Sequence, residues 1–161
     1  RWRPELAQRL RAPVLRLSQE MLALAVVALA VATIDEILAA AAPETPGEFR
    51  PNVVVSVTRF GAAYSLDVAA NAVIEKFAGL EQAHEIGRDR VTVDGVEWAH
   101  IESTFVDPRV GTLVQAAHLA VVVNGPVADL VQVTGSVTGV QAKAGVLDTL
   151  RSIQRSARAT A

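Results

Sequence analysis

The chain has 161 residues, a length typical of one domain, and 51% of them are hydrophobic, so it can bury a sizeable core. Its 15 basic and 17 acidic side chains give a net charge of −2 with no long run of either sign, which argues against a nucleic-acid partner. It contains no cysteine, which excludes disulfides, a thiolate nucleophile and a cysteine-ligated zinc site from this chain. We expect a single domain over residues 1–161.

The first 48 residues are predicted to form a region of helix or strand that ends in a loop at Pro43–Gly47. A short amphipathic helix is predicted from Trp2 to Leu10. Over Ser18–Ala42, residue propensities favour one long buried helix, but an unbroken apolar run has no period that separates helix from strand. The alternative is a buried strand over Ala23–Val31 followed by a short helix over Ile34–Ala41.

The apolar run within this region is too short to cross a membrane as a helix. It extends from Leu22 to Thr33, about 12 residues, whereas a membrane-spanning helix needs roughly 20. We therefore predict no membrane span.

A strand and a helix follow. The β-branched residues from Asn52 to Phe60 alternate between two faces, which predicts a central or nearly central strand. Ser65 is predicted to cap a helix whose apolar residues recur every three or four positions, and Gly79 is predicted to end it at the C′ position. The apolar face of this helix is expected to pack on the sheet.

Four strands joined by turns come next. Asp94 and Gly95 between β-rich segments are the strongest short signal of a hairpin. The segments Asp107–Gly111 and Asn124–Pro126 predict two further turns. The predicted strands are Val91–Val93, Val96–Val106, Thr112–Val123 and Val127–Ser136. They are expected to form an antiparallel meander.

The chain closes with a helix predicted from Val140 to about Ser156, and Arg151–Ala161 is expected to fray. The apolar stripe of this helix consists of Val146, Leu147, Leu150 and Ile153. Strands and helices do not alternate along the chain as they do in strand–helix–strand crossovers. The order of the elements therefore predicts an α+β fold with a curved, mostly antiparallel β-sheet flanked by helices.

The meander brings candidate site residues together if its strands pair in one register. We take Phe105 to lie opposite Leu113 across the turn at Asp107–Gly111. His100 then lies opposite His118, and Glu102 shares their face. Two imidazoles and a carboxylate could hold a divalent metal. Polar side chains on a solvated sheet face explain the same pattern, and we favour that interpretation, so we predict no catalytic residue, no metal site and no cofactor.

Trp98 lies on the same face and is the best candidate for an anchor on a ligand or partner surface, which would also include His100, Glu102 and His118. Alternatively, the terminal helix covers Trp98 as ordinary core. Glu97 and Glu102 lie on opposite faces of one strand, so they cannot form the paired acid and base of a glycosidase. The glycine motifs of nucleotide-binding proteins and of hydrolase nucleophile elbows are also absent.

Two short segments resemble a known family. Phe49 to Val55 reads FRPNVVV, an F-x-P-N-x-V-V stretch, and Leu130 to Gly135 reads LVQVTG shortly before the terminal helix. With the order of elements over Phe49–Ser156, they resemble the actinobacterial LpqN-type proteins, which are similar to the wider Mog1/PsbP-like fold. The resemblance implies a curved antiparallel sheet flanked by helices and a strand before F-x-P-N. It also implies a binding or accessory role without established catalytic residues, in a secreted or lipid-anchored protein of the cell envelope.

The first functional hypothesis is a non-enzymatic binding or accessory module for an apolar ligand or a partner protein of the cell envelope. One alternative is a metal-dependent or hydrolytic enzyme that uses His100, His118 and Glu102. Another is a structural subunit of a homo-oligomer in which the apolar segment Met21–Leu38 packs between copies. We expect a monomer or weak dimer. A cytoplasmic location stays open beside the envelope, because we expect neither a signal peptide nor a lipid-attachment cysteine in this chain.

Overall fold

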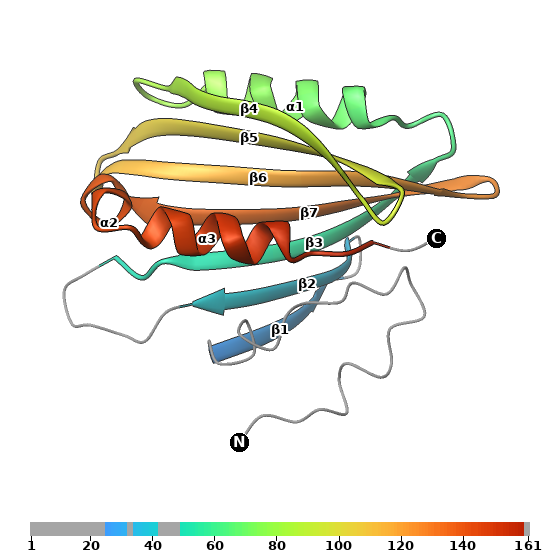
Figure 1. The fold of residues 1–161 in the computed structure, drawn as a ribbon, viewed down its shortest axis with the longest axis horizontal. Coiled ribbons are helices and arrows are strands. Elements are labelled where there is room, and N and C mark those ends of the chain that lie inside the picture. Colours follow the sequence, from blue (N-terminus) through green and yellow to red (C-terminus); the bar gives the residue numbers. More distant parts are fainter. Residues whose placement is uncertain (1–24, 32–33, 42–48, 160–161) are drawn as a thin grey trace.

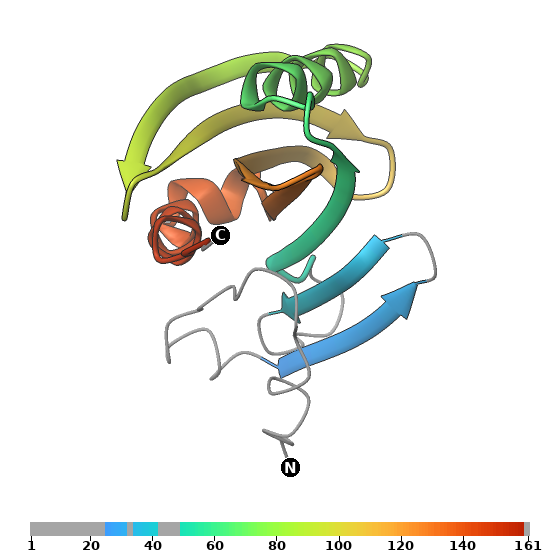
Figure 2. The same cartoon turned by 90° about the vertical axis from the view of Figure 1, so that its right-hand side faces the viewer.

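The fold is a curved antiparallel sheet with helices on both faces (Figure 1, Figure 2). The structure, a computed structural model, describes residues 25–31, 34–41 and 49–159. The helix predicted over Trp2–Leu10 and the loop predicted over Pro43–Gly47 lie outside these residues. The elements are β1 Ala25–Val31, β2 Ile34–Ala41, β3 Asn52–Gly61, α1 Leu66–Ala78, β4 His84–Val93, β5 Val96–Asp107, β6 Gly111–Asn124, β7 Val127–Thr138, α2 Gly139–Lys143 and α3 Val146–Arg155. The strands form one sheet in the order β1-β2-β3-β7-β6-β5-β4, and the predicted α+β class is confirmed.

The helices α1 and α3 cover opposite faces of the sheet. In Figure 2, α3 lies inside the curve of the sheet and α1 lies on the outer side. The core beneath α3 includes Val53, Val55, Val57, Trp98, Val131, Val133, Leu147 and Leu150. The core beneath α1 includes Ala69, Val73, Phe77, Ala99, Ile101 and Leu119. Neighbouring residues of β5 therefore belong to different cores, as the alternation of side chains along a strand requires.

The N-terminal segment is a hairpin of two strands. β1 pairs with β2, and β2 pairs with β3, both antiparallel. The long helix predicted over Ser18–Ala42 is therefore wrong, because the described residues of this segment form β1 and β2. The short helix predicted over Ile34–Ala41 is also wrong. The strand predicted over Ala23–Val31 is confirmed for Ala25–Val31. β2 is hydrogen-bonded along both of its edges, to β1 and to β3, and this pairing overrides the local helix propensity of alanine and leucine.

β3 and α1 follow their predicted patterns. Val53, Val55 and Val57 are each at most 4% exposed and belong to the core beneath α3. The Ser65 side chain caps α1 by accepting a hydrogen bond from a backbone N–H of the first turn at 3.3 Å. Gly79 ends the helix but has a right-handed φ of −80°, so it is not the left-handed C′ glycine that we predicted.

The meander is confirmed, with one strand longer than predicted. Asp94 and Gly95 both have positive φ, 52° and 81°, as a two-residue hairpin turn between β4 and β5 needs. β4 begins at His84, however, seven positions before Val91. Its first part is mostly exposed at the edge of the sheet, so it lacks the apolar alternation that predicts a strand.

The C-terminal helix is interrupted by Gly145. The single helix predicted over Val140–Ser156 is divided into α2 and α3, because the left-handed φ of 89° at Gly145 does not continue a helix. The prediction that Arg151–Ala161 frays is wrong for residues 151–159, which are the ones the structure describes. Ala157 and Ala159 are 1% and 3% exposed and pack in the core beneath α3.

Gly135 determines how closely α3 approaches β7. A β-carbon at this position would lie 2.4 Å from both methyl carbons of Leu150. Leu150 is itself 3% exposed, so its side chain has little space in which to move. The close packing of α3 therefore requires a residue without a side chain at position 135.

We predict that Gly135→Ala lowers the free energy of unfolding by about 1–3 kcal/mol, because the added methyl group overpacks the contact with Leu150. Urea denaturation followed by circular dichroism measures this change. Gly61→Ala is the control, since a β-carbon at Gly61 meets nothing within 4 Å. In the double variant Gly135→Ala/Leu150→Ala the clash is absent, so the two changes should cost less than the sum of their separate effects. Equal stability of Gly135→Ala and Gly61→Ala would contradict this account of the packing.

Candidate functional site

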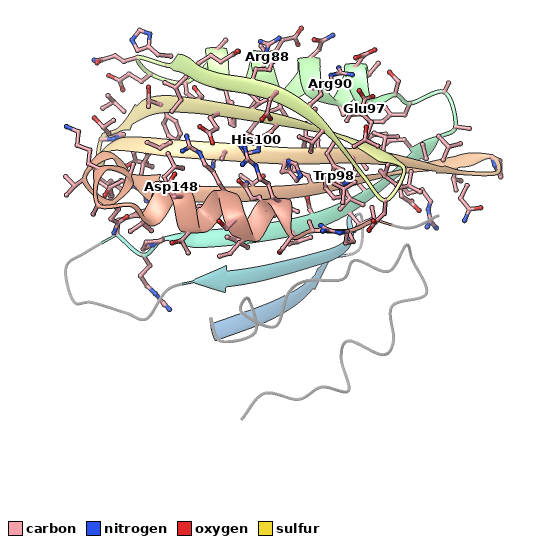
Figure 3. The ribbon with its side chains drawn as sticks, viewed as in Figure 1. Arg88, Arg90, Glu97, Trp98, His100 and Asp148 are labelled. Atoms are coloured by element: carbon pink, nitrogen blue, oxygen red, sulfur yellow. The ribbon has the colours of Figure 1, made fainter. Side chains whose placement is uncertain are left out.

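The register between β5 and β6 is the one predicted. Phe105 pairs with Leu113, and His100 pairs with His118. Parity then places Glu102 on the same face as His100, which is the face that α3 covers. Figure 3 labels Trp98 and His100 on β5, near α3.

The four residues predicted to form a ligand or partner surface are buried. The exposed fraction is 0% for Trp98, 5% for His100, 4% for Glu102 and 1% for His118. The solvated face that we favoured is therefore wrong. The alternative, that the terminal helix covers Trp98 as core, is confirmed, because Trp98 packs in one cluster with residues of α3.

Glu102 is the centre of a buried ion network. The guanidinium of Arg151 donates to both of its oxygens, from Nε to Oε1 and from Nη2 to Oε2, each at 2.7 Å. His100 Nε2 lies 2.8 Å from Oε1. The hydrogen bonds from Arg151, together with the hydrogen bond to His100, lower the pKa of Glu102 to about 2 against the opposing effect of burial. The carboxylate is therefore ionised, and the N–H at Nε2 of His100 donates to it.

His118 lies beside both Trp98 and His100. Its ring stacks on Trp98 with the centroids 4.6 Å apart, and it meets the His100 ring edge-on at 5.4 Å. Neither ring nitrogen has a hydrogen-bond partner among the described residues. Burial, together with the charges of His100 and Arg155, lowers the pKa of His118 to about 4. The His118 ring is therefore neutral at pH 7.

Gln154 of α3 was not predicted as a site residue, yet it is fully buried. Its Nε2 donates to the carbonyl oxygens of Ala116 and Val133, both at 2.9 Å, and so joins α3 to β6 and β7. The sequence does contain a signal for this burial. Gln154 follows Leu147 and Leu150 at helical spacing, which places it on the buried stripe of α3.

A cleft of about 470 Å³ opens between α3 and the edge strand β4, with residues of β5 between them. We call it the α3–β4 cleft. Its charged lining residues are Arg88, Asp89, Glu102, Asp148, Arg151 and Arg155, and its other lining residues are Ile86, Gly87, His100 and Ser152. Of the four predicted surface residues, His100 and Glu102 line this cleft, whereas Trp98 and His118 do not. Figure 3 labels Asp148 on the α3 wall of the cleft and His100 on β5.

The charged walls of the α3–β4 cleft were not predicted. Asp148, Arg151 and Arg155 lie at spacings of three and four on α3, so helical periodicity could have placed them on one face. Nothing in the sequence pattern indicated that Asp89 belongs to a strand opposite that face. The cleft therefore becomes visible only once β4 and α3 are placed on the sheet.

The geometry does not favour a metal ion at the predicted position. Both oxygens of Glu102 already accept hydrogen bonds from Arg151. In the part of the chain that the structure describes, no group of three His, Cys, Asp or Glu side chains is arranged to hold a metal. The alternative of a metal centre at His100, His118 and Glu102 is therefore not supported.

No protein-family model and no curated protein matches this chain. Solved structures do. LpqN of Mycobacterium tuberculosis, a protein involved in cell envelope biogenesis, aligns with a TM-score of 0.64 at 12% identity, over 93% of this chain and 85% of that chain. PA94 of Pseudomonas aeruginosa, a protein of unknown function and putative regulator, aligns with a TM-score of 0.51 at 12% identity, over 80% and 94% of the two chains. Cyanobacterial PsbP from Synechocystis sp. PCC 6803 aligns with a TM-score of 0.46 at 13% identity, over 84% and 92%.

The chain has the fold of LpqN. The resemblance to LpqN-type proteins and the Mog1/PsbP-like fold that it implied are confirmed as a likeness of fold, which is what identities of 12% support. None of the helices in the described ranges has the length and apolar character of a membrane-spanning helix.

We predict that Arg151→Met lowers the free energy of unfolding by about 2–3 kcal/mol, because it leaves the buried Glu102 carboxylate without its cation. Arg88→Met is the matched control. Arg88 binds Glu85 with the same two-point geometry, at 3.0 and 2.6 Å, but both side chains are exposed. Its loss should cost far less. Equal losses in urea denaturation would show that burial of Glu102 is unimportant.

We also predict that stability falls as the pH drops from 6.5 towards 4. The pKa of His118 is lowered from 6.5 to about 4 in the native state, so in this window the unfolded chain binds more protons. The loss is at most about 1.4 kcal/mol per pH unit. Glu102 affects stability at lower pH. Its carboxylate stabilises the native state above pH 4.5, and this contribution to stability is lost as the pH falls through about 2.

Urea denaturation at pH values from about 5 to about 8 measures the slope due to His118. His118→Phe keeps an aromatic ring against Trp98 and should remove this slope. His84→Gln is the control, because His84 is exposed on β4 and should leave the slope unchanged. The same slope in His118→Phe and the wild type would rule out His118 as its source.

Proposed function

We propose that this chain is a non-enzymatic binding or accessory module of the cell envelope, and that its ligand or partner binds in the α3–β4 cleft. The observation that carries the proposal is the cleft itself. It has about 470 Å³ of space between α3 and β4, and charged residues of β4, β5 and α3 line it. Concave sites with convergent polar groups are where proteins bind ligands.

The chemistry of the cleft supports binding over catalysis. Arg151 holds Glu102 ionised, so this carboxyl has no proton to give near neutral pH. His118, the other residue of the hydrolytic alternative, is fully buried and does not line the cleft. A catalytic use of His100, His118 and Glu102 is therefore less well supported than a binding role.

The envelope location is supported by the likeness to LpqN, whose described role is in cell envelope biogenesis. The proposal extends that location, but no particular partner, to this chain. A monomer or weak dimer remains our prediction, and so does the alternative of a homo-oligomer packed through Met21–Leu38.

The lining of the cleft favours a polar occupant over the apolar ligand that we first expected. Ile86 is its one large apolar side chain. A second cleft, beneath α1, is lined mainly by apolar residues, including Ile74 and Phe77, but it has a volume of only about 100 Å³. That is far below the usual size of a ligand pocket. We therefore propose a polar small molecule, or a polar group of a partner protein, as the occupant.

The test is native mass spectrometry of the purified chain, before and after denaturation. We predict a mass excess that disappears on denaturation and that is absent from Ser152→Trp, in which the indole fills the cleft. Thr149→Trp is the control, because Thr149 is also exposed on α3 but does not line the cleft. Loss of the bound mass in both variants, or a bare protein mass in the wild type and after incubation with envelope extract, would contradict binding in this cleft.

A further inference from the structure

Side chains of both charges line the α3–β4 cleft. The guanidinium groups of Arg151 and Arg155 and the carboxylates of Asp89, Glu102 and Asp148 belong to residues that line it. Arg88 pairs with Ile101 of the core beneath α1, so its side chain lies on the other face of the sheet. A ligand with a single kind of charge would meet side chains of its own sign as well as of the opposite sign. A ligand that carries both a positive and a negative group can place each group beside a side chain of the opposite charge.

One end of the cleft offers a hydrogen-bond acceptor. Glu102 Oε1 accepts two hydrogen bonds, from His100 and Arg151, whereas Oε2 accepts one, from Arg151. A carboxylate oxygen can accept two, so Oε2 retains an open acceptor position.

Gly87 leaves space beside Glu102 Oε2. It lies opposite Glu102 on β4, and a β-carbon there would be 3.5 Å from Oε2. Any side chain at this position would occupy the space from which a donor could approach Oε2. The carboxylates of Asp89 and Asp148 line the same cleft, so the donor best suited to this space carries a positive charge.

The other end of the cleft offers a cation that a ligand can recruit. Arg155 makes an ion pair with Asp89 at 3.6 Å, beyond hydrogen-bond distance, and its guanidinium makes no hydrogen bond within the described residues. Both side chains are about half exposed, so this pair is weak. An anionic group could therefore replace Asp89 as the partner of Arg155 and form two hydrogen bonds with its fork.

The two ends are close together. Asp89 lies two residues from Gly87 along β4, which is about 7 Å. We propose that the α3–β4 cleft binds a dipolar ligand, in which a short chain joins an ammonium group to a carboxylate or phosphate. The ammonium end binds Glu102 Oε2 in the space beside Gly87, and the anionic end binds Arg155. This assignment rests on the proposed binding function and adds the chemical class of the ligand.

The test is an NMR titration of the full chain that follows the amide signals of residues 87–89 and 148–155. Glycylglycine supplies an ammonium group and a carboxylate, and O-phosphoethanolamine supplies an ammonium group and a phosphate. The single-charge probes are ethanolamine, acetate and inorganic phosphate. We expect at least one dipolar probe to bind about tenfold or more tightly than every single-charge probe, because each end adds a charge-assisted hydrogen bond. The stronger of the two identifies the anionic group.

Two variants test the two ends separately. Gly87→Ala places a methyl group in the space beside Oε2, and Arg155→Gln removes the cation. Each should weaken the dipolar probe about tenfold. The controls are Gly61→Ala, where a β-carbon meets nothing within 4 Å, and Arg109→Gln on the exposed turn after β5. Both controls should bind as the wild type does, and urea denaturation confirms that every variant is folded.

The outcomes separate this inference from the proposed function. Single-charge probes that bind as tightly as the dipolar ones would overturn the dipolar ligand, and so would an unchanged affinity in both cleft variants. Binding of no probe would overturn it as well. In each of these cases, a bound mass in the wild type that Ser152→Trp removes would leave the proposed binding function intact. The absence of any such bound mass would refute both the dipolar ligand and the binding function.

Discussion

The candidate site depends on the packing of α3 inside the curve of the sheet. Leu147 and Leu150 bury the apolar side of this helix, and Gly135 allows Leu150 to approach β7 closely. Gln154 adds hydrogen bonds to carbonyl groups of β6 and β7. These contacts are uncharged and buried, so they hold α3 in place independently of the cleft. The charged residues on the adjoining face of α3 are thereby presented to β4 and β5 at a fixed position.

The same packing explains the unusual chemistry beneath α3. Glu102 is buried on the inner face of β5, and a buried carboxylate is stable only when it is paired and hydrogen-bonded. Arg151 supplies that pair from α3, and His100 completes it. Nearby polar atoms of Trp98 and His118 nevertheless lack partners among the described residues. Replacing a buried ion pair by apolar residues of similar volume is often neutral or stabilising, so these polar groups are not needed to account for the stability of the fold.

Sequence reasoning predicted the β-meander well and the two ends of the chain poorly. The turn signals and the alternation within each strand are local, and the turn at Asp107–Gly111, with Phe105 taken opposite Leu113, led to the correct pairing of His100 with His118. The N-terminal strands failed because an alanine- and leucine-rich segment suits a helix unless a neighbouring strand edge recruits it. Of the four residues predicted for a ligand or partner surface, His100 and Glu102 line the α3–β4 cleft, whereas the α3 and β4 residues beside them were not predicted.

The sequence by itself determined the strands of the meander, their register and the face on which each side chain lies. These properties follow from turn geometry and from the two-residue period of a strand, which are local. Only the tertiary structure decided that this face is buried, that Glu102 meets Arg151 and that a charged cleft opens beside them. Those two residues are 49 positions apart. Their contact arises from the docking of α3, which is decided by the shape of the whole core and by no periodicity within either segment.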